Sequence, residues 1–347
     1  MTEKFLIGTY TQKTSKGVYQ IELDTDQKQL ENAQLIAKIS CPTYVVESDD
    51  HKIYAIDRNQ DESETRGGLA VFDGSTMPAK LMQEDIEVGP SPAYITVDEG
   101  RKMVYTANYH TGNVIAYHIE ADGTVKESQR IHDDGMTGPL PEQQSGPHPH
   151  YADLTPDDRL VICDLGLDRV YLDDVSDEGE ITPVSEVQLS PGFGPRHIAF
   201  VESAGKAYLI GELSSKIAVL DYNEEAGIFT VQQVVKTIPN DYKDQNGGAA
   251  IRVSNDDKYV YVSNRGHDSL AVFKILDDGD LERIQIISTE GEFPRDFNFN
   301  SDQSFLIVVN QNTNNATLYE RNPETGKLTM VQKDFAVPEG TCVAPRK

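Results

Sequence analysis

The 347-residue sequence contains no tryptophan, only three cysteines, and no hydrophobic run near the roughly eighteen residues needed to span a membrane. Its first residues lack the basic and hydrophobic segments of a signal peptide, so we expect a cytoplasmic protein. Cys41, Cys163 and Cys342 have no metal-ligand spacing, which predicts buried free thiols. Basic residues are also scarce. With 31 Lys and Arg against 57 Asp and Glu, the net charge of −26 disfavours nucleic acid and anionic membranes as partners.

The sequence does contain an internal repeat. Each copy has a Pro or Gly, a short alternating strand, a polar turn, and a β-branched and aromatic strand that ends in a polar residue. A third strand with a Gly-containing turn and a more variable fourth strand follow. Six copies begin at Pro42, Pro92, Pro149, Pro195, Gly248 and Pro294. Their spacing is close to the roughly 40 to 50 residues of a four-stranded propeller blade.

The two ends of the chain together complete a seventh repeat. "PEGTCVAPRK" from Pro338 supplies the first strand, while "KFLIGTYT" and "KGVYQIELD" near the N-terminus supply the second and third. We therefore predict an all-β fold, a single domain over residues 1–347. It is a seven-bladed β-propeller with four antiparallel strands per blade, closed by a blade shared between the N- and C-termini. A pair of β-sandwiches is the alternative, but sandwiches need no such circularly permuted match.

Propeller geometry predicts which residues share a rim. If the first strand of each blade is innermost, its start lies at the same rim as the end of the second strand. The starts of the first strands supply His148, His150, Arg196, His197 and Arg295. The ends of the second strands supply Asn108, Tyr109, His110, Asp164, Glu212, Asn264, Arg265, His267 and Asn310. The arginines would concentrate positive charge in a negative protein, which favours binding of a carboxylate or phosphate.

Motifs at this rim resemble those of the seven-bladed β-propeller lactonase family, which includes propeller-type 6-phosphogluconolactonases and fungal carboxy-cis,cis-muconate cyclases. They are "TANYHTGNV", "GPHPHYADLTPDDR", "DLGLDRVY", "GPRHIAF", "SNRGHDSLAVF" and "PRDFN", and the resemblance covers essentially the whole chain. It implies an intramolecular ester as substrate, a sugar acid or related acid as product, and no obligatory metal. The positions proposed for catalysis in the family match His150, Arg196, Glu212 and Arg265.

Lactone hydrolysis requires an activated water, a donor to the oxyanion and an acid for the leaving alkoxide. We expect His150 to be the base, oriented by a carboxylate such as Glu212. Arg196 would stabilise the oxyanion, and Arg265 and Arg295 would anchor a distal anion of the substrate. The further candidates for substrate binding are His148, His197, Tyr109, His110, Asn264 and His267. The structural alternatives are salt bridges between blades for the arginines and strand-end contacts for the histidines.

We predict hydrolysis of an anionic sugar lactone, with 6-phospho-D-glucono-1,5-lactone as the first candidate. The alternatives are a non-catalytic propeller that binds a small acid or a protein at the same mouth, and a muconate-type cycloisomerase. His148, His150, His197 and Glu212 have donor atoms suited to zinc, but no local two-histidine motif supports such a site, so we expect no metal or other cofactor. We expect a monomer or weak homodimer whose partner is the small lactone.

Overall fold

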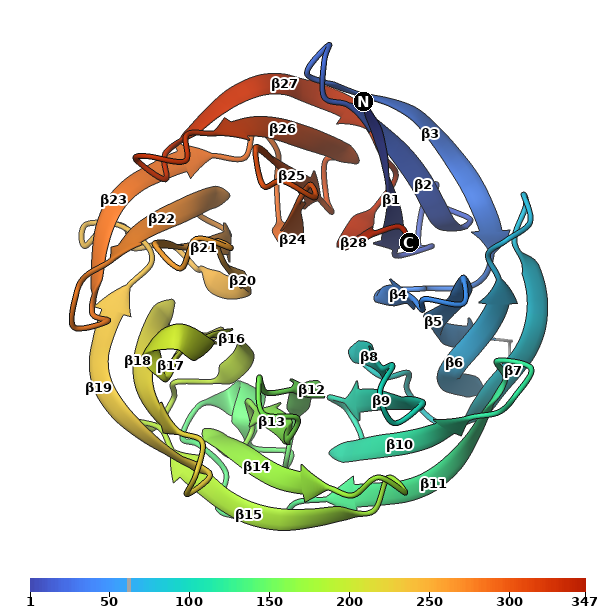
Figure 1. Cartoon of the computed structure of the whole chain (residues 1–347), viewed down its shortest axis with the longest axis horizontal. Coiled ribbons are helices and arrows are strands. Elements are labelled where there is room, and N and C mark those ends of the chain that lie inside the picture. The colour runs from blue at the N-terminus through green and yellow to red at the C-terminus, as the bar shows by residue number, and fades with distance from the viewer. Residues whose placement is uncertain (61–63) are drawn as a thin grey trace.

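The structure, a computed structural model, describes residues 1–60 and 64–347 and confirms the seven-bladed propeller. Seven four-stranded sheets, numbered here as blades 1 to 7, surround a central axis (Figure 1). Neighbouring strands pair antiparallel, as β1 does with β2 and with β28. The strand order β28-β1-β2-β3 confirms that both ends of the chain share one blade.

The first four blades are listed from the inner to the outer strand. Blade 1 contains β28 (Gly340–Pro345), β1 (Thr2–Thr9), β2 (Gly17–Asp24) and β3 (Gln29–Lys38). Blade 2 contains β4 (Val45–Glu47), β5 (Lys52–Gln60), β6 (Thr65–Asp73) and β7 (Lys80–Val88). Blade 3 contains β8 (Tyr94–Asp98), β9 (Met103–Asn108), β10 (Asn113–Ile119) and β11 (Val125–His132). Blade 4 contains β12 (Pro149–Leu154), β13 (Leu160–Asp164), β14 (Arg169–Val175) and β15 (Ile181–Gln188).

The remaining three blades follow the same order. Blade 5 contains β16 (Pro195–Val201), β17 (Lys206–Gly211), β18 (Lys216–Asn223) and β19 (Ile228–Lys236). Blade 6 contains β20 (Gly247–Val253), β21 (Tyr259–Arg265), β22 (Ser269–Ile275) and β23 (Leu281–Ser288). Blade 7 contains β24 (Pro294–Phe299), β25 (Phe305–Asn310), β26 (Asn315–Arg321) and β27 (Leu328–Ala336). Two short 3-10 helices, η1 (Pro141–Gln143) and η2 (Glu202–Ala204), lie in connections.

Hydrophobic packing between blades holds the ring together. The second strands β9 and β25 are buried at every residue because they lie between neighbouring blades, whereas the outer strand β11 is largely exposed. Each core cluster joins two adjacent blades, as Tyr105 of blade 3 packs in one cluster with Leu160 and Ile162 of blade 4. Burying one such side chain contributes about 1.5–3 kcal/mol. The β-branched and aromatic second strands therefore determine both the sheets and their arrangement around the axis.

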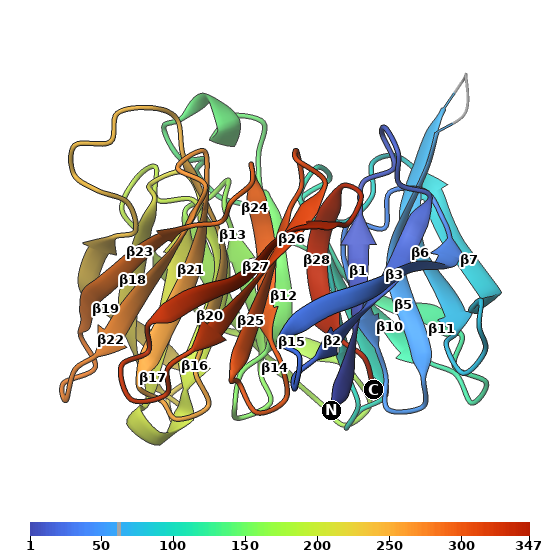
Figure 2. The same cartoon turned by 90° about the horizontal axis from the view of Figure 1, so that it is seen from above.

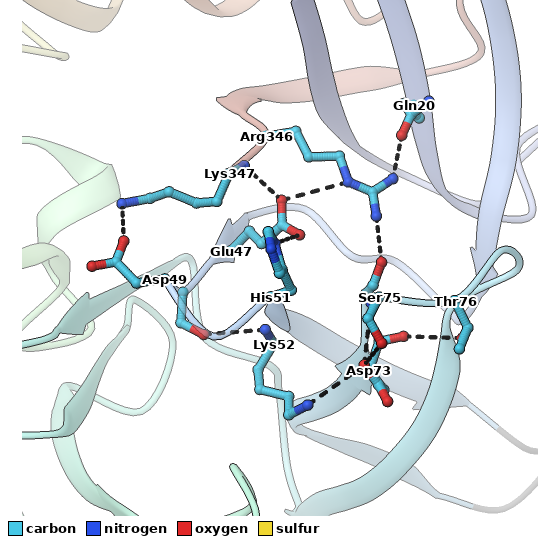
Figure 3. Close-up of polar contacts among 12 residues, drawn as sticks. Gln20, Glu47, Asp49, His51, Lys52, Asp73, Ser75, Thr76, Arg346 and Lys347 are labelled. Carbon is cyan, nitrogen blue, oxygen red and sulfur yellow. Dashed lines mark hydrogen bonds and ion pairs between the residues drawn. The ribbon is translucent and has the colours of Figure 1, made fainter.

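Polar contacts reinforce the junction between blades 1 and 2 (Figure 3). The backbone nitrogen of Lys347 donates to Glu47 Oε2 over 2.9 Å, and Arg346 Nε lies 3.6 Å from the same oxygen. Arg346 also bonds Gln20 of β2 and the carbonyl of Gly74, which follows β6. One buried carboxylate thus ties the segment after β28 to blade 2.

The two faces of the ring differ in what they display. Both termini lie at one face, whereas the loop that carries η1 projects from the other (Figure 2). The three cysteines are buried and free, as predicted. In the described part of the chain, no helix is long and apolar enough to cross a membrane.

Candidate active site

A cavity of about 240 Å³ lies at the face away from the termini, where the second strands end. It is smaller than the roughly 300–1,000 Å³ of pockets for drug-sized molecules, so it suits a ligand about the size of one sugar. All seven blades contribute to its lining, which consists of Tyr10, Cys41, Thr43, Arg58, Ser91, Pro92, Ala93, Tyr109, His110, His150, Glu212, Arg265 and Arg295.

Larger hollows lie elsewhere in the ring, four of them with volumes of about 390 to 930 Å³. One of about 930 Å³ is at the opposite face, between turns and the chain ends, and one of about 460 Å³ occupies the central channel. None of these four hollows is lined by His150, Glu212 or Arg265. The smaller cavity collects these groups and is the candidate active site.

Two positions of the repeat supply most of this cavity. One is the residue that follows the last position of the second-strand pattern. It gives Tyr10, Arg58, Tyr109, Glu212 and Arg265. The other is the residue immediately after the Pro that begins the first-strand pattern, and it gives Thr43, Ala93, His150 and Arg295. Arg196 occupies this second position in blade 5 and lies directly behind Glu212. The repeat therefore explains why residues far apart in sequence meet here.

A β-bulge explains how the second of these positions aims its side chains. In blade 4, Pro149 pairs with Asp164 and Tyr151 with Cys163, so His150 is left out of the ladder. The same irregularity leaves out Arg196 in blade 5 and Arg295 in blade 7. A bulge adds one unpaired residue to a strand and redirects its side chain, and bulges are frequent next to active sites. The side chains of His150, Arg196 and Arg295 are thus directed by the same kind of β-bulge.

Glu212 holds two arginines at the edge of the cavity. Its Oε2 atom lies 2.8 Å from Arg196 Nε and 2.8 Å from Arg265 Nη2. Arg196 Nη1 also donates to the Ala249 carbonyl over 2.8 Å, and Arg265 Nη2 donates to the Gly248 carbonyl over 3.1 Å. Because both guanidinium groups are buried and bonded to fixed carbonyls, their orientation is set before any ligand arrives.

The cluster of Glu212, Arg196 and Arg265 carries more positive than negative charge. Burial would raise the pKa of Glu212, but Arg265, Arg196 and Arg295 outweigh burial and hold that pKa below its usual value. Burial, reinforced by Arg265, lowers the pKa of Arg196 to about 9, which leaves the group protonated at neutral pH. Burial likewise lowers the pKa of Arg265, against the opposing effect of Glu212. One carboxylate therefore faces an excess of positive charge.

His150 lines the cavity as a neutral imidazole. Its pKa is lowered well below 6.5, first by burial and then by Arg196, Arg295 and Arg265. Within residues 1–60 and 64–347, Nδ1 of His150 has no hydrogen-bond partner. Glu212 bonds Arg196 and Arg265, and no hydrogen bond between Glu212 and His150 occurs among the described residues. His150 is instead packed among rings, 5.2 Å from the His197 centroid and 6.1 Å from that of Tyr109.

The other predicted rim residues occupy three kinds of place. Tyr109 and His110 line the cavity, and burial raises the pKa of Tyr109 to about 12, so its hydroxyl stays neutral. His148 lies behind Tyr109: it stacks on that ring at 4.4 Å, and its ring nitrogens contact the Tyr109 carbonyl and Ser145 Oγ. His197 lies deeper, with Nε2 3.3 Å from Arg196 Nη1. His148 and His197 therefore support lining residues and do not themselves line the cavity.

Asn264 and His267 lie outside the cavity. The Asn264 side chain is fully buried and bonds Thr237 and Ser269. His267 Nδ1 lies 2.8 Å from the same Ser269 hydroxyl. No group of three His, Cys, Asp or Glu suited to a metal occurs among the described residues, and this includes the three histidines and Glu212 considered for zinc.

Sequence reasoning missed several lining residues, above all Arg58 and Tyr10. Both follow the strand-end position of the repeat, as Glu212 and Arg265 do. A register count across all seven repeats would have found them.

Comparisons with known proteins agree with this fold. Residues 4–345 match the family described as "Lactonase, 7-bladed beta-propeller". A Bacillus subtilis protein named 6-phosphogluconolactonase is 40% identical, and the match covers 97% of this chain and 96% of that protein. An uncharacterized protein of Lactococcus lactis subsp. cremoris is 45% identical, over 99% of this chain and 100% of its own. A crystal structure from Lactobacillus plantarum has a TM-score of 0.94 at 48% identity and covers 100% of both chains.

The chain thus belongs to the seven-bladed β-propeller lactonase family. Membership of this family suggests a hydrolase. The residues at the mouth are those with which an ester bond can be attacked and its developing charge stabilised.

Proposed function

We propose that this protein hydrolyses an anionic sugar lactone, with 6-phospho-D-glucono-1,5-lactone as the substrate to test first. One observation carries the proposal. A neutral, buried histidine shares a sugar-sized cavity with an arginine that a glutamate holds in a fixed position. The name of the Bacillus subtilis relative supports this choice of substrate.

In the proposed reaction, water attacks the lactone carbonyl and His150 accepts a proton from it. A new carbon–oxygen bond forms and the carbonyl oxygen becomes an oxyanion, to which the cavity-lining Arg265 donates. The ring carbon–oxygen bond then breaks, and the protonated His150 returns its proton to the leaving alkoxide. Arg196, with a side chain only 3% exposed, acts behind Glu212 by keeping the cluster positive and ordered.

The charge of the substrate tunes this histidine. Burial and, after it, the arginines lower the pKa of the His150 side chain. An anionic substrate offsets their field, so the imidazole becomes a stronger base when substrate is bound. The same field attracts an anion to this mouth on a protein of net charge −26. We also propose that the protein acts in the cytoplasm, where its three buried cysteines remain reduced.

The test is a direct lactonase assay of wild type and His150→Ala on 6-phosphogluconolactone, corrected for spontaneous hydrolysis. Loss of a general base should lower kcat by about 10²- to 10⁴-fold. His51→Ala is the matched control, since His51 lies at the opposite face beside Glu47 and should retain wild-type kcat. Equal rates for wild type, His150→Ala and the blank would refute hydrolysis of this lactone.

A further inference from the structure

The outer strand of each blade has one edge that pairs with no other strand in the described part of the chain (Figure 1). Exposed strand edges can pair with another chain, and proteins protect them with charged side chains or proline. Six outer strands follow this rule, with charged residues inside the strand such as Glu31, Glu84, Glu127, Glu186, Arg283 and Lys333. The seventh, β19 of blade 5, has no charged residue before its last position, Lys236.

The free edge of β19 is also apolar. Ile228, Val231 and Val234 leave 37–49% of their surface exposed. Val184 of the neighbouring outer strand β15 is exposed as well, and it lies against the turn before β19, where a Cβ atom on Gly227 would be 2.7 Å from Val184 Cγ1. We call the strand Ile228–Lys236 with its preceding turn the β19 edge. An exposed apolar strip of this kind indicates a contact surface.

The two ends of the β19 edge carry opposite charges. The turn before the strand contains Glu224 and Glu225. At the other end, Lys236 lies directly opposite Lys216 of β18, and like charges in such a pair destabilise a sheet. Arg283 of blade 6 adds a third positive charge there, because its Nη1 atom donates to the Lys236 carbonyl over 3.2 Å. Within residues 1–60 and 64–347, none of these five side chains forms an ion pair.

We infer that the β19 edge is a homodimer interface, in which the β19 strands of two copies lie antiparallel across a two-fold axis. A protein of net charge −26 repels a second copy over most of its surface, so contact is favoured where charge is absent or complementary. Across a two-fold axis, the acidic turn of each copy faces the basic end of the other, and the apolar side chains meet between them. The second copy thus supplies the carboxylates that the pair of Lys216 and Lys236 lacks.

The position of β19 defines what kind of dimer this is. β19 lies on the outer wall of the ring, whereas the candidate active site lies at one face (Figure 1). No residue of the range 224–236 is in the described lining of that cavity, so both cavities stay open in the dimer. One strand and one turn from each copy make a small contact, and small contacts belong to weak, transient complexes. The dimer therefore forms at high protein concentration and does not depend on the proposed lactonase function.

The first test is sedimentation velocity of wild type at about 1 to 300 μM, where the mean mass should rise from that of one chain toward that of two. Val234→Glu places a charge in the apolar centre, and the two-fold axis brings two such charges together. It should raise the dissociation constant at least about 10-fold. Met330→Glu is the matched control, since Met330 is 39% exposed on the outer strand β27, and it should leave the dissociation constant unchanged. A wild type that stays monomeric, or a dimer that Val234→Glu weakens no more than Met330→Glu does, would overturn the inference.

An exchange of charges tests the antiparallel arrangement. Lys236→Glu and Glu225→Lys should each weaken the dimer about 3- to 10-fold, because like charges then meet at both ends of the interface. The double variant should recover the wild-type dissociation constant, since its two ends are again complementary. A double variant that dimerises no better than the single variants would show that the strands do not meet in this way. Thermal unfolding of each variant checks that it folds.

Discussion

Two carboxylates at opposite faces of the ring gather the same kinds of neighbour. At the cavity, Glu212 lies 2.8 Å from each of two guanidinium nitrogens. At the other face, Glu47 accepts from a backbone nitrogen and lies 3.6 Å from Arg346 and 3.5 Å from His51 (Figure 3). Residue type alone therefore does not distinguish a site from a structural junction.

Glu47 and Glu212 differ in how deeply they are buried and in whether they face a cavity. The Glu47 side chain is 0% exposed, and Arg346 is further bonded to groups of blades 1 and 2, so this cluster joins chain segments. The Glu212 side chain is 22% exposed and lines a cavity together with one of its arginines. His51, which is half exposed to solvent, belongs to the Glu47 cluster. The buried His150 instead lines the cavity together with Glu212. One face of the Glu212 cluster is therefore open to a cavity, whereas Glu47 is enclosed by protein.

The largest expected effect comes from exchanging each carboxylate for an amide. Glu212→Gln should lower kcat/KM by about 100-fold, because the two arginines lose the anion that positions them. Glu47→Gln should leave kcat/KM near wild type. Glu212→Gln should lose about 3 kcal/mol of unfolding free energy, since it leaves the buried Arg196 and Arg265 without their charged partner. Glu47→Gln should also lose stability, but less, because Arg346 is partly exposed. Steady-state kinetics and urea unfolding measure the two effects.

The informative result is whether Glu212→Gln loses activity that Glu47→Gln keeps, although both variants lose stability. Equal kinetic losses in Glu212→Gln and Glu47→Gln would mean that general destabilisation explains both. The difference between the faces would then have no bearing on function.

A smaller effect is expected from the arginines. Arg265→Ala should weaken binding of 6-phosphogluconate by about 1.5 to 3 kcal/mol, the range for hydrogen bonds to charged groups. Arg196→Ala should weaken it less, because Arg196 lies behind Glu212 and acts on the ligand only through the cluster. Arg346→Ala should lower the unfolding free energy and leave the dissociation constant unchanged. Isothermal titration calorimetry with all three variants makes the comparison. Unchanged affinity in both Arg196→Ala and Arg265→Ala would assign these arginines to structure alone.

The fold was predictable because each repeat contains its own strand and turn signals. Each blade carries its own Pro or Gly, its own turn residues and its own buried second strand, and the ends of the chain supplied complementary parts of one blade. Local signals of this kind do not depend on the rest of the molecule. The rim that carries the site followed from strand direction alone.

The site was predictable only in part, because one step of register decides which side chains face the cavity. Asn264 and Arg265 are adjacent, yet the first is buried between strands and the second lines the cavity. A bulge at His150 shifts the direction of its neighbours, and no sequence pattern marked that bulge. His148, on the other side of Pro149, turns to Tyr109 instead.

The register also identifies an exception among the strand-end residues. At this position blades 3, 6 and 7 carry Asn108, Asn264 and Asn310, and each donates from Nδ2 to a carbonyl of the segment that precedes its blade. Blade 2 carries Asp57 instead, and its Oδ2 has no hydrogen-bond partner among the residues described. A carboxylate cannot make the donation that the three amides make.

The smallest expected effect is on the unfolding free energy and concerns Asp57. This third carboxylate has neither the arginine partners of Glu212 nor the contacts with the chain end that Glu47 makes. Burial, reinforced by Glu84, raises the pKa of Asp57 to about 6. A carboxyl group whose pKa is higher in the folded chain stabilises the fold while protonated, below about pH 4, and this stabilisation is lost as the pH rises through 6. At about 1.4 kcal/mol per pKa unit, Asp57→Asn should gain about 1 to 3 kcal/mol of unfolding free energy over wild type at pH 7.5 and little at pH 4. Urea unfolding at both pH values measures the difference, and a gain of equal size at both would contradict the raised pKa.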